Sequence, residues 1–229
     1  TLPTTRNGPK ALVDSVAQMK RHLLDSVGAN AKLAPFAAIG IPGVPQGNGW
    51  LLNTGSLEGL DSVDMRGMFE DRLGCEVHLE NDVNMAAYGE LLDSQSPSQG
   101  TRVLISVGTG LGMGIVHCGK VLRGATGHAG EIAYLPISAD LQSPEVRQRG
   151  AAEMLVSGPV FERRYLSFSG IRRTADQILQ LNLEDDRYAV TAVNELAHHL
   201  ARVVVSVAVT LDPEIVVMAG GLGSSPILY

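Results

Sequence analysis

Two adjacent polar side chains, Asn81 and Asp82, follow an apolar segment at 76–79 and precede a helical segment at 84–92. A carboxylate in this place can accept a proton from a hydroxyl group, and an asparagine amide both donates and accepts hydrogen bonds, which suits a sugar hydroxyl. Ligands of α/β proteins bind at this carboxyl edge of the sheet. Taken alone, the pair fits a helix cap better, because Asn and Asp commonly hold the first free N–H groups of a helix.

Two glycine-rich segments could approach a nucleotide closely. Gly108, Thr109 and Gly110 stand between two apolar strands, where backbone N–H groups and one hydroxyl could contact a phosphate. A hairpin turn with positive φ explains this segment equally well, and it is neither a P-loop nor a Rossmann fingerprint. Gly220 and Gly221 follow a strand at 214–219 and could seat the flat face of a base, although an ordinary strand-to-helix turn explains them somewhat better.

Three further polar segments carry weaker signals. Glu131 begins a predicted strand and could bind a pair of hydroxyls, whereas His128 fits an ordinary loop histidine. The short basic clusters at 163–164 and 172–173 both fit solvated helix faces.

The composition is that of a soluble globular protein. The 229 residues are 45% apolar and 18% charged, and the 26 glycines favour an α/β protein. A net charge of −6 excludes a basic nucleic-acid-binding surface over the chain as a whole. Two cysteines without a Cys-x-x-Cys motif, no signal peptide and no apolar run of 18 residues predict a cytoplasmic protein with no membrane partner.

Elements alternate along the first part of the chain. The apolar spacing predicts helices at 11–27, 63–73 (capped by Asp61 or Ser62) and 84–92, with strands at 36–41, 50–52 and 76–79. The polar, breaker-rich run at 93–100 predicts a boundary between domains at 1–96 and 97–229.

The second part has consecutive strands and then helices. Strands are predicted at 102–107, 113–117, 120–122, 131–135 and 214–219, and helices at 151–157, 160–167 and 185–211. The last helix carries apolar residues on most faces of its second half, so we expect it to be largely buried.

The order of these motifs resembles the ROK family of bacterial repressors and sugar kinases over nearly the whole chain. The matching segments are GIPG at 40–43, LENDVNMAAYGE at 79–90, LISVGTGLGMGIVHCGKVLRGATGHAGEI at 104–132 and LDPEIVVMAGGLG at 211–223. The resemblance implies an α/β, actin-like ATPase (ribonuclease H-like) fold with two α/β lobes around a cleft. The family's opening Asp-x-Gly-x-Thr hairpin and its last helix and strand have no counterpart, so the chain is expected to be N- and C-terminally incomplete.

The resemblance also implies roles for the matching residues. In the family's kinases the Asn-Asp pair, here Asn81 and Asp82, binds the sugar, and the Asp is the catalytic base. Other sugar-binding positions correspond to Gly43, Glu131 and Glu153. The nucleotide-binding positions correspond to Gly108, Thr109, Gly110, Gly220 and Gly221. In the expected fold, Asn81 and Asp82 line the cleft from one side, and Glu131, Tyr134 and Glu153 line it from the other.

The chain departs from the family at its structural zinc site. The four family ligands, one histidine and three cysteines, correspond to Tyr134, Pro144, Val146 and Ala151. A tetrahedral zinc site needs four donors, so we expect no structural zinc. The segment at 136–149 is then held by packing or is mobile, and the Tyr134 hydroxyl could replace the histidine's sugar contact.

These departures lead us to expect the sugar-sensing effector domain of a ROK transcriptional regulator. It would bind a hexose-like ligand, need no cofactor, form a homodimer or higher homo-oligomer, and reach DNA through a helix-turn-helix outside this chain. The alternative is an ATP-dependent sugar kinase with ATP and Mg²⁺ and with Asp82 as general base. A scaffold protein with a decayed site is a third class, which the retention of Asn81, Asp82, Glu131 and Glu153 disfavours. The sequence does not identify the sugar.

Overall fold

The structure is a computed structural model of the chain, and it divides into two compact units, Thr1–Met85 and Ala86–Tyr229. Each unit is described by itself. The predicted domain boundary at 93–100 falls mostly on residues 94–98, which lie outside the described part. The residues described are 5, 7–27, 34–52, 54, 57, 59–93 (backbone only at 91–93), 99–137 and 141–228.

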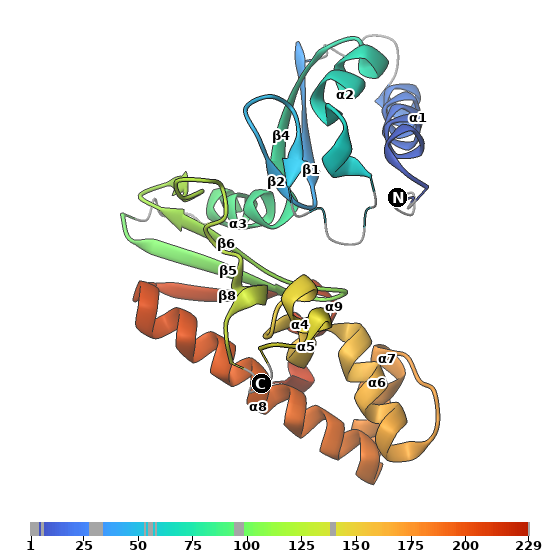
Figure 1. Cartoon of the computed structure of the whole chain (residues 1–229), viewed down its shortest axis with the longest axis vertical. Coiled ribbons are helices and arrows are strands. Elements are labelled where there is room, and N and C mark those ends of the chain that lie inside the picture. The colour runs from blue at the N-terminus through green and yellow to red at the C-terminus, as the bar shows by residue number, and fades with distance from the viewer. Residues whose placement is uncertain are drawn as a thin grey trace. The chain divides into compact units, whose positions relative to one another are not determined.

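The first unit is built on a parallel strand pair, β1 (Phe36–Ile41) with β4 (Glu76–Asn81). Parallel strands end at the same edge, so the residues after Ile41 and after Asn81 are neighbours. Two helices pack on each other, α1 (Pro9–Val27) and α2 (Met65–Leu73), and a short antiparallel pair joins β2 (Val44–Pro45) to β3 (Leu51–Leu52) (Figure 1). Their core includes Val13, Leu51, Phe69 and Val77.

The predicted start of α2 is wrong by two residues. Asp64 is the N-cap, and its Oδ1 accepts a hydrogen bond from Gly67 N at 2.9 Å. Asp61 and Ser62 instead belong to a separate 3₁₀ turn, η1 (Leu60–Ser62), which buries Leu60. Several polar residues in a row could each have capped the helix, and packing of the preceding turn selects among them.

The second unit contains a four-stranded sheet in the order β7 (Lys120–Val121), β6 (Leu111–His117), β5 (Thr101–Val107) and β8 (Ile215–Ala219). The β5–β6 hairpin is antiparallel and the β5–β8 pair is parallel. Val103, Ile105 and Val107 alternate along β5 into the same core as the long helix α8 (Arg187–Leu211), which runs along the sheet (Figure 1). The second half of α3 (Asp82–Asp93) lies beside Leu104, on the other side of that strand.

Shorter helices surround the start of α8. They are α4 (Pro144–Arg149), α5 (Glu153–Val156), α6 (Gly158–Ser169) and α7 (Ala175–Leu183), followed beyond β8 by α9 (Gly220–Gly223) and η3 (Pro226–Leu228). Thr174 and Gln177 form a capping box at the start of α7, and Asp186 caps α8. These local signals fix where each of the two helices begins.

Two predictions for the second unit are wrong. Residues 131–135 form no strand but the 3₁₀ turn η2 (Ile132–Tyr134), with Tyr134 N bonded to Glu131 O and Leu135 N to Ile132 O. A β-carbon at Gly130 would lie 2.2 Å from Met113 O, so the chain passes close to β6 immediately before this turn.

Helix α8 is not largely buried either. Val205 is 58% exposed and Val209 is 79% exposed, because only one face of the helix packs on the sheet. Among the described residues no helix is long and apolar enough to cross a bilayer.

Candidate functional site

Asn81 is the last residue of β4, and its side-chain amide makes most of its hydrogen bonds within the first unit. Its Oδ1 accepts hydrogen bonds from Val83 N and Asn84 N, both at 3.0 Å, and its Nδ2 donates to Gly43 O at 3.0 Å. The helix-cap interpretation of the sequence is therefore realised by Asn81. One amide hydrogen is left to bind a ligand.

Asp82 begins α3 with one carboxylate oxygen engaged. Oδ1 accepts a hydrogen bond from Val83 N at 2.9 Å, and no partner for Oδ2 is found in the described part of the chain. The surrounding protein excludes water from part of this carboxylate and raises the pKa of Asp82 above its ordinary value, although the Val83 N–H acts in the opposite direction. A carboxylate with a free oxygen and a raised pKa is suited to accept a proton from a hydroxyl.

The sequence reasoning missed two residues that hold this junction. Glu80 Oε1 accepts hydrogen bonds from Asn81 N at 3.0 Å and from Asn84 Nδ2 at 3.1 Å. Asn84 is 4% exposed, and its Oδ1 is buried without a partner among the described residues. Both residues stand in the run Glu-Asn-Asp-Val-Asn, but their contact depends on how the chain passes from the end of β4 into α3, which the sequence does not show.

The segment at 108–110 forms the tight turn of the β5–β6 hairpin, in which Gly108 N bonds to Gly110 O at 3.0 Å. Neither glycine has a positive φ, so the expected conformational reason for glycine does not apply. Position 110 requires glycine because no room is left for a side chain, since a β-carbon there would lie 2.8 Å from the Glu153 carboxylate. Thr109 is exposed at the tip.

Gly220 and Gly221 differ in why a glycine stands at each position. Gly220 has φ +84°, and a β-carbon there would lie 2.4 Å from Val107 O, so the fold itself requires glycine. Gly221 has open space around its β-carbon position, and its N–H is 3.8 Å from the β-carbon position of Gly108. The two glycine segments, more than a hundred residues apart, thus lie side by side, as a shared nucleotide site would need.

Glu131 lies at the start of η2 in a group of charged side chains. Partial burial raises its pKa above the ordinary glutamate value, the nearby Glu153 carboxylate raises it further, and His128 lowers it. Burial and the same two carboxylates also raise the pKa of the Tyr134 phenol. Glu131, Tyr134 and Glu153 therefore lie near enough to interact electrostatically, and their role as one side of a sugar site stays a prediction.

Glu153 is held from two directions. Its Oε2 accepts a hydrogen bond from Leu111 N at 3.1 Å, and its Oε1 pairs with the Arg149 guanidinium at 3.3 Å. Only 18% of the Glu153 side chain is exposed. The contact with Arg149 was not predicted, although the spacing of four residues was a readable signal.

Tyr134 contacts the segment that replaces the family's zinc loop. Its hydroxyl donates a hydrogen bond to Gln148 O at 3.2 Å, and Gly150 lies so close that a β-carbon there would be 2.2 Å from Ala133 O. In the described part of this segment, Pro144 and Val146 belong to α4. The described residues contain no group of three or more His, Cys, Asp or Glu side chains that could hold a metal.

The candidate residues fall into two sets. Gly43, Asn81 and Asp82 belong to the first unit, and the second unit brings Glu131, Tyr134 and Glu153 near the glycine turn. The expected convergence of both sets on one ligand stays a prediction.

A family model described as the ROK family matches residues 2–229. The chain belongs to the ROK family. It is 26% identical, over its full length and 78% of the relative, to the N-acetyl-D-glucosamine kinase of Vibrio parahaemolyticus serotype O3:K6. The ROK hexokinase from Thermus thermophilus superposes with a TM-score of 0.79 at 25% identity, covering 98% of this chain and 74% of that one.

A second solved structure extends the likeness. The ROK family glucokinase from Streptomyces griseus, in complex with glucose and AMPPNP, superposes with a TM-score of 0.76 at 23% identity over 96% of this chain and 74% of that one. These superpositions confirm the actin-like ATPase fold predicted from the sequence.

The predicted function as a regulator's effector domain is wrong. The N-acetyl-D-glucosamine kinase relative and the hexokinase and glucokinase structures favour the kinase alternative over the repressor role with its DNA partner. The prediction failed because the positions of the lost zinc ligands, Tyr134, Pro144, Val146 and Ala151, are not the residues that the alternative requires. Asp82 and the 108–110 turn are retained.

Proposed function

We propose that this chain belongs to an ATP-dependent sugar kinase that transfers a phosphoryl group to a hydroxyl of a hexose-type sugar. The names of the similar kinases make N-acetyl-D-glucosamine the first substrate to test, with glucose second. The observation that carries the proposal is Asp82, a carboxylate with a free oxygen and a raised pKa at the start of a helix.

Asp82 would act as the general base. Its Oδ2 would take the proton from the sugar hydroxyl. At the same time the sugar oxygen would bond to the γ-phosphorus of ATP, and the bond between that phosphorus and the oxygen of the leaving ADP would break. The Val83 N–H keeps Oδ1 fixed, so that Oδ2 alone is available for the proton. Asn81 would donate its remaining amide hydrogen to a second sugar hydroxyl.

The second unit would supply the remaining contacts. Glu131 can accept hydrogen bonds from sugar hydroxyls, whereas Glu153, with both oxygens engaged, would bind sugar only through their remaining lone pairs. The Thr109 hydroxyl and the open backbone at Gly221 fit a nucleotide. Mg²⁺ would neutralise phosphate charge, and the described residues offer it no ready-made cluster of ligands.

A coupled assay for ADP release, run on the full-length protein with a panel of N-acetylated and plain hexoses, tests the proposal. We expect sugar-dependent turnover, and Asp82→Asn should lower kcat by about a hundredfold or more with a smaller change in the KM for sugar. Asp71→Asn, at an exposed position of α2, is the matched control and should leave kcat unchanged. ADP release that no sugar stimulates would contradict the kinase.

A further inference from the structure

An open pocket of about 420 Å³ lies between α6 and the start of α7, in the second unit. Its walls come from one face of α6, including Glu162, Arg163 and Leu166, and from the loop carrying Arg172 and Arg173. Its volume is in the range of pockets that hold small molecules. None of its lining residues belongs to the candidate kinase site.

The charge of the pocket opposes that of the chain. Three arginines line it, Arg163, Arg172 and Arg173, against one carboxylate, Glu162, whereas the whole chain carries a net charge of −6. Glu162 Oε1 accepts a hydrogen bond from Ala175 N at 2.9 Å, so this carboxylate is already occupied at the N-terminus of α7. The pocket therefore presents an excess of positive charge to a ligand.

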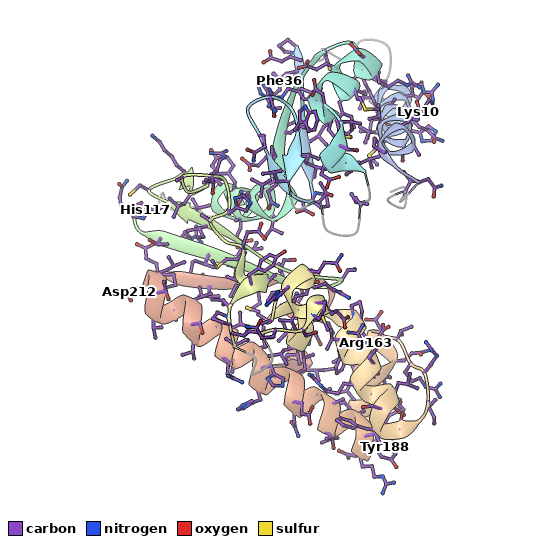
Figure 2. The ribbon with its side chains drawn as sticks, in the orientation of Figure 1. Lys10, Phe36, His117, Arg163, Tyr188 and Asp212 are labelled. Atoms are coloured by element: carbon purple, nitrogen blue, oxygen red, sulfur yellow. The ribbon has the colours of Figure 1, made fainter. Side chains whose placement is uncertain are left out.

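The arginines of the basic clusters at 163–164 and 172–173 have different surroundings in the fold. Arg164 is 13% exposed and pairs with Glu195 at 3.1 Å, as a packed residue between α6 and α8. Its neighbour Arg163 is half-exposed and pairs with Glu145 at a distance of 3.9 Å. Figure 2 shows Arg163 toward the same end of α8 as Tyr188, far from Asp212 at the other end.

The other two arginines are less constrained. Arg173 donates a hydrogen bond from Nη1 to Arg172 O at 3.1 Å, and no ion pair is found for either side chain within the described part of the chain. Their charges therefore lack the carboxylate partners that surface arginines often have, and both side chains are exposed beside the pocket.

We propose that this pocket binds a small phosphate-bearing molecule, as a site separate from the kinase centre. A phosphate ester carries nearly two negative charges and several acceptor oxygens, which guanidinium groups bind in a bidentate manner. Pro159 and Leu166 provide an apolar wall for the organic part of the ligand. A sugar phosphate and a nucleotide share this chemistry, and the experiment separates them.

Isothermal titration calorimetry on the full-length protein tests the pocket with pyrophosphate, glucose 6-phosphate, N-acetylglucosamine 6-phosphate and AMP. Glucose and adenosine serve as phosphate-free controls. We expect at least one phosphate compound to bind, and its dissociation constant to rise about tenfold or more in Arg172→Gln/Arg173→Gln. The compound whose affinity falls in the pocket variant, and not in the control variant, identifies the source of the phosphate.

The matched control is Arg21→Gln/Arg202→Gln, which removes the same charge from exposed helix positions elsewhere. This control should bind as the unchanged protein does, which excludes a general effect of net charge. Arg163→Gln, on the α6 wall, gives a second and independent variant if the loop variant unfolds at a lower temperature.

Binding is measured without turnover, so this inference and the proposed kinase fail separately. Equal affinity of the pocket variants and the control, or no binding by any phosphate compound, overturns the pocket. Sugar-independent ADP release overturns the kinase and leaves the pocket standing.

Discussion

Glu153 Oε2 accepts a hydrogen bond from Leu111 N at 3.1 Å, so one carboxylate fixes the residue directly after the glycine turn at 108–110. The same carboxylate is held on its other oxygen by Arg149. A residue expected to bind sugar therefore also positions the segment expected to bind nucleotide. The glycine at position 110 follows from this contact, because any side chain there would meet Glu153.

This relationship predicts coupling between Gly110→Ala and Glu153→Ala. Each single substitution should lower the free energy of unfolding by about 1–3 kcal/mol, since each leaves Leu111 N without its partner. In the Glu153→Ala background the added methyl at 110 meets no carboxylate, so its cost should fall by about 1 kcal/mol or more. Urea unfolding of the four proteins measures the cycle, and strictly additive costs would show that the two positions act independently.

The Tyr134 hydroxyl should be a measurable tether for α4. Tyr134→Phe removes the hydrogen bond to Gln148 O but keeps the ring, and we expect a loss of about 0.5–1.5 kcal/mol in the free energy of unfolding. Hydrogen exchange should become faster at the amides of 146–150. Tyr188→Phe, in α8, is a control of the same chemistry that should leave exchange at 146–150 unchanged, and equal effects of both variants would contradict the tether.

Asp82 should make the protein less stable as the pH rises. Its pKa is raised in the folded state, so between the ordinary value of 3.8 and the raised value the folded protein binds more protons than the unfolded chain. Stability therefore falls as the pH rises through this window and stays lower above it. Asp82→Asn removes this cost, so the variant should unfold at a higher temperature than the unchanged protein at pH 7.

Below pH 3.8 that difference should disappear, because Asp82 is then protonated in both states. Asp71→Asn, at an exposed position of α2, is the matched control. A lower melting temperature of Asp82→Asn at pH 7 would mean that the carboxylate stabilises the fold.

The sequence identified most of the fold and the residue types of the site, but not how those residues are held. The regular spacing of apolar residues, together with glycines at the ends of elements, located α1, β5, β6 and α8 to within a few residues. It misassigned 131–135, because the four-residue apolar run at 132–135 has no period that separates a strand from a 3₁₀ turn.

The backbone partners of Glu153 and Tyr134 were beyond sequence reasoning for a related cause. Both contacts are made to backbone atoms, Leu111 N and Gln148 O, and a backbone atom carries no residue-specific signal in the sequence. The pocket arginines were missed for another reason, since Arg163 and the pair at 172–173 share one charged surface only when the turn between α6 and α7 brings them together.

Asn81→Ser separates the cap from the proposed sugar contact. Serine caps helices about as well as asparagine, so the bonds to Val83 N and Asn84 N can be replaced, and the free energy of unfolding should fall by no more than about 1 kcal/mol. Serine lacks the amide nitrogen, so the remaining N–H donor is lost together with the bond to Gly43 O. We therefore expect the KM for sugar to rise about tenfold at nearly unchanged stability, because one hydrogen bond to the ligand is missing.

Asn81→Ala, which loses both functions, should raise the KM similarly and also destabilise the fold by about 1–2 kcal/mol. If Asn81→Ser leaves the KM unchanged, Asn81 is a helix cap and nothing more, and the sugar must be held by other groups.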